Sequence, residues 1–165
     1  MEDLPDFDAL TPYAKIRAHQ GKLAGLEDRS ACIEIMKLWD VPSFMDAQCY
    51  TILTTPDEKE TWLRYAVWRQ SGCNTDKPYF EALEKKTSID SFNRLAEGLA
   101  EVNFSLFKVS RDQWLDATTT GLVFSLGDSH IDLTWMASFN EEWKPLEKWC
   151  AKTETYFRRF FPKDS

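Results

Sequence analysis

The chain has 165 residues, of which 43% are hydrophobic and 28% are charged, and its net charge is −7 at pH 7. This length predicts a single domain spanning residues 1–165, large enough to bury a core without disulfide bonds. The negative charge argues against a nucleic-acid-binding protein, because affinity for DNA or RNA depends on neutralising phosphates with Lys and Arg.

The lack of targeting signals in these residues and the spacing of the cysteines predict the cellular location of the protein. No apolar run approaches the roughly 20 residues that a transmembrane helix needs. The acidic first residues also lack the basic and apolar regions of a secretory signal. The four cysteines are far apart, without a Cys-x-x-Cys pair. That spacing is typical of reduced, buried thiols rather than of disulfides or a zinc site. We therefore expect a cytoplasmic protein that contacts no membrane.

The first half of the chain predicts helices. Residues 1–10 are acidic and contain a proline, which predicts a loosely ordered acidic arm. Five helices are then predicted from polar caps or early prolines followed by apolar residues at helical spacing. They begin at Thr11, Ser30, Ser43, Thr55 and Pro78. The clearest start is Thr55-Pro56-Asp57-Glu58, which has the pattern of a capping box.

The second half predicts a mixture of helices and strands. Ser88 caps a sixth helix with Phe92, Leu95, Leu99 and Val102 on its apolar side. Residues 104–109 predict a strand and residues 110–115 a short helix. The most regular strand patterns are residues 122–126 and 130–136. A last amphipathic helix begins near Lys144, with an apolar stripe at Leu146, Trp149, Cys150, Thr153, Phe157 and Phe160.

Gly127-Asp128 is predicted to be the two-residue turn of a β-hairpin, since glycine suits the first position of such a turn. In that register Leu126 faces Ser129 and Ser125 faces His130. The apolar residues then share one face, which we expect the last helix to cover: Leu122, Phe124, Ile131, Leu133 and Trp135. His130 and Asp132 lie on the opposite face.

The stretch Gly127-Asp128-Ser129-His130 also looks like a serine-hydrolase signature. Its first three residues resemble the serine motif of the GDSL-type hydrolases. In that family the serine lies near the start of the domain and an Asp-x-x-His pair lies late, and neither holds here. Ser129 and His130 are also neighbours on one strand and point to opposite faces, so His130 is not placed to activate Ser129. We therefore predict a turn rather than a nucleophile.

Other chemistries find no support in the residues. There are only two histidines, in no metal-binding spacing, and no glycine-rich phosphate loop. We predict no catalytic residue, no metal ligand and no cofactor. Two charged features remain in the C-terminal region. Residues 144–163 hold six basic side chains and only two acidic ones, and Lys144, Lys148, Lys152 and Arg159 share one side of the helix.

The sequence thus predicts an α+β domain that is mainly helical. About six helices come first, followed by a small antiparallel sheet of two or three strands and a C-terminal amphipathic helix. We expect a non-catalytic protein-binding domain of immunity or regulatory type, because the chain is small, acidic and rich in aromatic residues. Its partner would be another protein of basic character. The candidate binding residues are His130, Asp132, Asp128, Tyr156 and Phe161.

Two alternatives stay open from the sequence. Rings crowd around the end of the last helix, so that helix is also a candidate surface for self-association. The protein could instead be a small enzyme or a ligand-binding domain with a pocket between helices and sheet. Such a pocket would hold a carboxylate and several of the residues Trp39, Trp62, Trp68 and Trp135.

Overall fold

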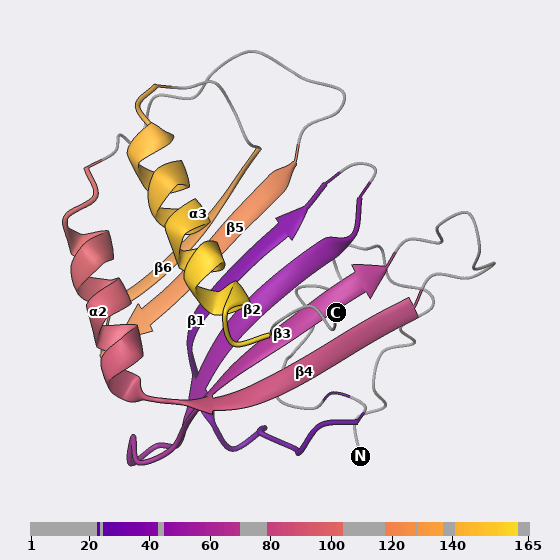
Figure 1. Ribbon diagram of the computed structural model, residues 1–165. Helices are drawn as coiled ribbons and strands as arrows, with labels where there is room; N and C mark the ends of the chain where they lie inside the picture. Colours follow the sequence, from indigo (N-terminus) through magenta and orange to yellow (C-terminus); the bar gives the residue numbers. More distant parts are fainter. Residues whose placement is uncertain are drawn as a thin grey trace.

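The protein is built on one six-stranded antiparallel sheet, with helices α2 and α3 packed side by side against one face (Figure 1). The computed structural model describes residues 23, 25–42, 45–69, 79–103, 118–127, 129–136 and 141–161. The strands are β1 (Ile33–Val41), β2 (Ala47–Thr54), β3 (Thr61–Arg69), β4 (Tyr79–Thr87), β5 (Thr119–Leu126) and β6 (Ser129–Met136). The helices are α2 (Ile89–Ala100) and α3 (Lys144–Arg158).

The prediction of a mainly helical fold with a sheet of two or three strands is wrong. Four of the predicted helices, those beginning at Ser30, Ser43, Thr55 and Pro78, are the strands β1 to β4. Gly25 and Leu26, expected at the end of the first predicted helix, lie in a turn and bend. The described residues therefore form an α+β fold that is mostly sheet.

For β1, β2 and β3, the helix prediction was wrong because these strands are buried on both faces. In β1, Lys37 and Trp39 on one face are as well buried as Met36 and Leu38 on the other. In β2, six consecutive residues up to Thr54 are buried. A strand buried on both sides shows a continuous apolar run rather than the alternation expected of a half-exposed strand. Periodicity alone does not distinguish such a run from a buried helix.

The apparent capping box at Thr55 forms a hairpin loop between β2 and β3. The backbone N–H of Glu58 donates to the carbonyl of Thr55 at 2.8 Å, and Thr55 N–H donates to the carbonyl of Glu60 at 2.9 Å. Glu58 has φ of 56°, a left-handed conformation that reverses the chain. Thr, Pro and Asp favour tight turns for the same local reasons that they favour helix starts.

The predicted C-terminal hairpin is confirmed, including its register. Leu126 pairs with Ser129, Ser125 with His130, and Val123 with Asp132. Gly127 has the positive φ, 56°, that the first position of the turn requires. The hairpin joins the rest of the sheet through β5, which pairs with β1, so the strand order is β4-β3-β2-β1-β5-β6.

The two described helices were also predicted correctly. Ser88 caps α2 by accepting a hydrogen bond from the N–H of Asp90 at 3.1 Å. The apolar stripe of α3 is buried as expected up to Phe157, and Phe160, just after the helix, is half-buried. The core between helices and sheet includes Phe92, which stacks on Phe124 of β5. It also includes Phe157, which packs on Tyr50 of β2. The two helices thus cover the sheet together, and Ile131, which was expected beneath the last helix, is instead 42% exposed.

On the opposite face, the indole of Trp39 lies directly over Gly121, its neighbour on β5. A Cβ atom added to Gly121 would lie 2.0 Å from the Trp39 ring. Trp39 is only 1% exposed. The absence of a side chain at Gly121 therefore makes room for the indole ring of Trp39.

The same face holds an ion-pair cluster of Arg64, Glu84 and Arg29. Arg64 and Glu84 are register neighbours on β3 and β4, and Arg64 Nε lies 2.6 Å from Glu84 Oε2. Arg29 binds the other carboxylate oxygen at 2.8 Å and stacks 3.9 Å over the Trp62 ring. Arg64 is fully buried, so its charge depends on Glu84 for compensation.

Several sequence predictions lie outside the described residues. They are the acidic arm at 1–10, the helix from Thr11 up to residue 22, the strand at 104–109 and the short helix at 110–115. No helix in the described ranges is long and apolar enough to cross a membrane.

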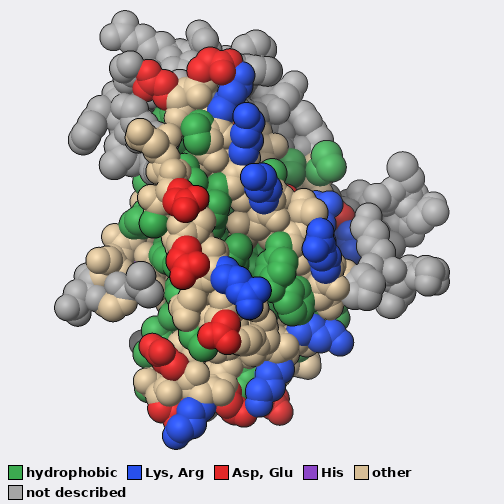
Figure 2. Space-filling view, turned by 60° about the vertical axis from the view of Figure 1, so that its left-hand side comes forward, with side chains coloured by type: hydrophobic (Ala, Val, Ile, Leu, Met, Phe, Trp, Pro, Cys, Tyr) green, Lys and Arg blue, Asp and Glu red, His purple; other side chains and the backbone are tan. Residues whose placement is uncertain are grey.

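The helix-bearing side of the molecule carries two kinds of charge. Figure 2 shows Lys and Arg side chains following one another in a row, with most Asp and Glu side chains to one side of it. The exposed basic residues of α3 include Lys148 and Lys152, with Arg159 directly after the helix. The exposed acidic residues of α2 are Asp90 and Glu97, with Glu101 directly after the helix.

Candidate functional site

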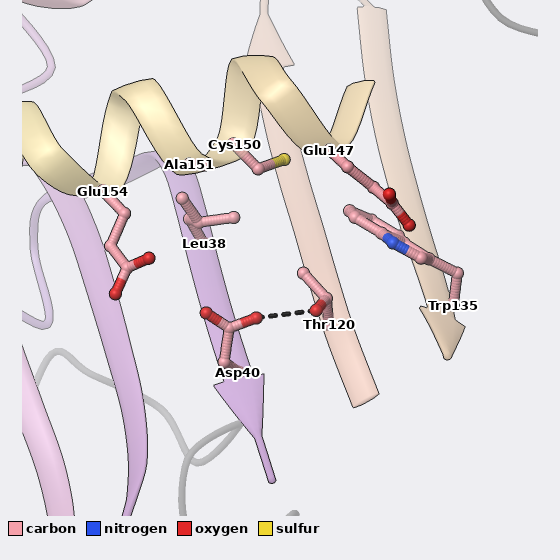
Figure 3. Close-up of a pocket in the computed structure, with 8 residues that line it drawn as sticks. All are labelled: Leu38, Asp40, Thr120, Trp135, Glu147, Cys150, Ala151 and Glu154. Atoms are coloured by element: carbon pink, nitrogen blue, oxygen red, sulfur yellow. Dashed lines mark hydrogen bonds between the residues drawn. The ribbon is translucent and has the colours of Figure 1, made fainter. Parts of the chain in front are cut away.

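A pocket lies between α3 and the sheet, where β1, β5 and β6 run beneath the helix (Figure 3). The sheet register places three of its residues in one row: Asp40 pairs with Thr120, which pairs with Trp135. Helix α3 contributes four more at helical spacing, and Leu38 completes the floor. The lining is Leu38, Asp40, Thr120, Trp135, Glu147, Cys150, Ala151 and Glu154.

The pocket is small and acidic. Its volume is about 240 Å³, below the roughly 300–1,000 Å³ of sites for drug-sized molecules. Its walls carry three carboxyl groups, from Asp40, Glu147 and Glu154. Figure 3 shows Glu154 reaching from α3 toward the sheet near Asp40, and Glu147 beside the indole of Trp135. The space therefore fits one small group rather than a large cofactor.

Asp40 is a half-buried carboxyl group at the floor of the pocket. The hydroxyl of Thr120 donates a hydrogen bond to Asp40 Oδ1 at 2.7 Å. Burial raises the pKa of Asp40 above its usual value, and the negative charge of Glu154 adds to this effect. The hydrogen bond from Thr120 opposes the shift without cancelling it. A positive charge placed beside Asp40 would therefore stabilise its ionised carboxylate.

Glu154 is held in place by its neighbours. Gln48 of β2 donates a hydrogen bond to Glu154 and also hydrogen-bonds to Asp40, so it links the two carboxyl groups. Arg158, one helical turn later, forms an ion pair with Glu154, in which Nη2 of Arg158 lies 2.6 Å from Oε1 of Glu154. Burial raises the pKa of Tyr50, which keeps its hydroxyl neutral as a hydrogen-bond partner of Arg158. These contacts fix the pocket wall on the helix side.

The thiols near the site are not nucleophiles at neutral pH. Burial raises the pKa of Cys150, in the pocket wall, to about 12. Burial has the same effect on Cys49, on the opposite face of the sheet, whose pKa is also about 12. A thiol reacts as its thiolate, so both side chains serve packing here. Within the described ranges, no three His, Cys, Asp or Glu side chains are grouped so that they could hold a metal ion.

The candidate binding residues predicted from the sequence do not form one site with this pocket. His130 and Asp132 are exposed on the sheet face that the helices do not cover, and His130 Nδ1 lies 2.9 Å from the Ser125 hydroxyl. Tyr156 and Phe161 are half-buried near the end of α3, where Phe161 stacks on Tyr65. Asp128 lies outside the described residues. The role of these residues in binding stays a prediction.

Sequence reasoning missed most of the pocket. Asp40 was placed in a helix, which separated it from Thr120 and Trp135. Glu147 and Glu154 were counted only as charges, although their seven-residue spacing puts them on one side of α3. Of the four tryptophans considered for a cavity, only Trp135 lines this pocket. Trp39, Trp62 and Trp68 are buried in the other face of the sheet.

Comparison with models of known protein families finds no match. Neither curated proteins nor solved structures give a match. The geometry of the pocket and the charges of the surface are therefore the basis for assigning a function.

Proposed function

We propose that this is a non-catalytic binding protein of immunity or regulatory type, and that the pocket beneath α3 receives a lysine or arginine side chain of a basic partner protein. The observation that carries the proposal is the set of three carboxyl groups around a pocket that opens to solvent. Arg158, which pairs with Glu154, stands outside the lining.

The chemistry of the lining supports a cationic occupant. A cation near Asp40 would compensate a carboxylate whose ionisation is disfavoured by burial and by the neighbouring charge of Glu154. Trp135 adds an aromatic wall, and indole is the best natural partner for a cation–π contact. The volume of about 240 Å³ suits a single side chain.

The charge of the whole protein supports a basic protein as the source of that cation. A net charge of −7 attracts a basic partner over long distances and raises the rate of encounter. The free thiols Cys32, Cys49 and Cys150 are consistent with a reducing compartment, so we also propose a cytoplasmic location. A free organic cation is the second candidate, because the same carboxyl groups would bind it.

Calorimetric titration with short peptides tests this proposal. The probes are an oligolysine and an oligoarginine peptide, their norleucine and citrulline counterparts, and n-butylammonium as a free cation. We expect the charged peptides to bind and the neutral ones not to bind. Equal binding of the norleucine peptide would contradict the proposal. Binding of n-butylammonium as tight as that of the peptides would assign the pocket to a free cation instead.

Asp40→Asn is expected to weaken binding of the charged peptides at least tenfold, since a hydrogen bond to a charged group contributes about 1.5–3 kcal/mol. Asn still accepts the hydrogen bond from Thr120. Folding raises the pKa of Asp40, so ionising this group in the folded protein is unfavourable. The free energy of unfolding therefore falls as the pH rises from the unfolded-state pKa to the native-state pKa of Asp40. The variant should therefore be at least as stable as the wild type at pH 7, as measured by urea unfolding.

The matched control is Asp57→Asn, which removes the same charge from the exposed loop between β2 and β3. It should leave peptide affinity within about twofold, because exposed charges contribute little. In the wild type, peptide affinity should rise as pH increases through the pKa of Asp40, and this rise should be absent in Asp40→Asn. A loss of affinity as large in the control as in Asp40→Asn would show that general charge, and not the pocket, binds the peptide.

A further inference from the structure

The outer sides of α2 and α3 carry opposite charges at the same spacing. After Asp90, the acidic residues Glu97 and Glu101 follow at steps of seven and four residues. Counted backwards from Arg159, the basic residues Lys152 and Lys148 follow at the same two steps. At 1.5 Å per residue, both rows have spacings of about 10 Å and about 6 Å. We call them the acidic row and the basic row.

The two rows are exposed, and the ion pairs recorded among the described residues include none of their six side chains. All six residues are solvent-exposed. Among the described residues they form no ion pair with one another, whereas Lys144 and Arg158 on α3 do have acidic partners. Their exposure makes both rows accessible to charges of another molecule.

The two helices run in opposite directions beside each other (Figure 1). They touch where Gly98 of α2 meets Trp149 of α3, and a Cβ on Gly98 would lie 3.3 Å from the indole nitrogen. Because of this contact, Glu97 lies within about one helical turn of Lys152 along the helix axes. Glu101 is equally close to the level of Lys148. Asp90 and Arg159 lie together at the other end of the pair.

We propose that a second copy of this chain docks on the α2–α3 face and forms a symmetric dimer. A two-fold axis parallel to the helices places α2 of each copy opposite α3 of the other copy. This rotation leaves the position of every residue along the axis unchanged. It therefore places the acidic row of each copy against the basic row of the other, giving three ion pairs on each side of the axis. A face with adjacent rows of opposite charge is self-complementary under this rotation.

Two other residues fit this interface. Arg94 interrupts the acidic row, and the position level with it in the basic row is Thr155, which is exposed and neutral. Arg94 therefore meets no opposing positive charge. Tyr156 is half-buried beside the basic row and packs on Phe160 with ring centroids 5.4 Å apart. Its exposed part adds apolar contact. Surface ion pairs contribute about 0.2–1 kcal/mol each, so the dimer is weak and depends on salt.

Analytical ultracentrifugation over a range of protein concentrations tests the dimer, at about 0.01 M and about 1 M ionic strength. We expect association at low salt and monomer at high salt. Lys148→Glu with Lys152→Glu should weaken the dimer at least tenfold, and so should Glu97→Lys with Glu101→Lys. The four changes together exchange the rows and should restore it. Circular dichroism on each variant confirms folding.

The control Lys59→Glu with Lys86→Glu alters net charge equally, at exposed positions in the β2–β3 loop and on the sheet face opposite the helices, and should leave the dimer intact. A wild type that stays monomeric at low salt overturns the proposal, and so does a fourfold variant that does not reassociate. A monomer whose basic row binds polyglutamate would assign that row to an acidic partner and also overturn it. None of these residues lines the pocket, so this result is independent of peptide binding.

Discussion

Gly121→Ala is expected to lower the free energy of unfolding by about 3 kcal/mol or more, at the upper end of what overpacking a core costs. The new methyl group would lie 2.0 Å from Cε2 and Cζ2 of Trp39, far inside van der Waals contact. Trp39 is 1% exposed and has no empty space to enter. Urea unfolding followed by tryptophan fluorescence measures the loss.

A double-mutant cycle assigns this loss to the Trp39 contact. Trp39→Phe removes the ring atoms that the methyl group meets, so Gly121→Ala should cost at least 2 kcal/mol less in that background. Gly98→Ala is the matched glycine control. Its Cβ meets Trp149 at only 3.3 Å, and alanine gains up to about 1 kcal/mol of helix propensity there. Equal costs of Gly121→Ala in both backgrounds would refute the role given to Trp39.

Glu84→Gln is expected to lower the free energy of unfolding by about 3 kcal/mol, because it leaves the fully buried guanidinium of Arg64 without its counter-charge. Arg29 loses its ion pair in the same step. The matched control is Glu81→Gln on the same strand, whose partner Arg69 is solvent-exposed. That change should cost less than about 1 kcal/mol. Similar costs for the two variants would contradict the importance of the buried cluster.

The Glu84 cluster also predicts how stability depends on acid. Burial by itself would raise the pKa of Glu84, but hydrogen bonds and charges from Arg29 and Arg64 outweigh it and lower the pKa. When folding lowers the pKa of a carboxyl group, its ionised form stabilises the fold fully above the unfolded-state pKa. This contribution is lost as the pH falls through the native-state pKa. The free energy of unfolding of the wild type should therefore fall as the pH is lowered through that window. Glu84→Gln should lack this component.

Local signals in the sequence predicted some elements correctly. The hairpin of β5 and β6 was predicted with its register, since a glycine turn and alternating residues act over a short distance. Helix α2 was located from the Ser88 cap, and α3 from its apolar stripe. In each case one side of the element faces solvent, so the periodicity of the buried side remains visible.

The central strands could not be predicted in the same way. Both faces of β1, β2 and β3 are buried, and a residue such as Arg64 sits in the interior only because Glu84 on the next strand compensates it. The pocket depends on those strands too. Asp40, Thr120 and Trp135 come together through strand pairing between distant segments, and no local spacing in the sequence records that pairing.

The strand order β4-β3-β2-β1-β5-β6 has a consequence for the kinetics of folding. Strands β1, β2 and β3 each pair with the next strand in the chain, as β5 does with β6, so both units can form from local contacts. Among the described strands, only the pairing of β1 with β5 joins distant segments, for example Met36 with Phe124. Closing that long loop is the costliest step in chain entropy. We therefore expect the transition state of folding to lie at the β1–β5 seam, with the meander and the hairpin already assembled on either side of it.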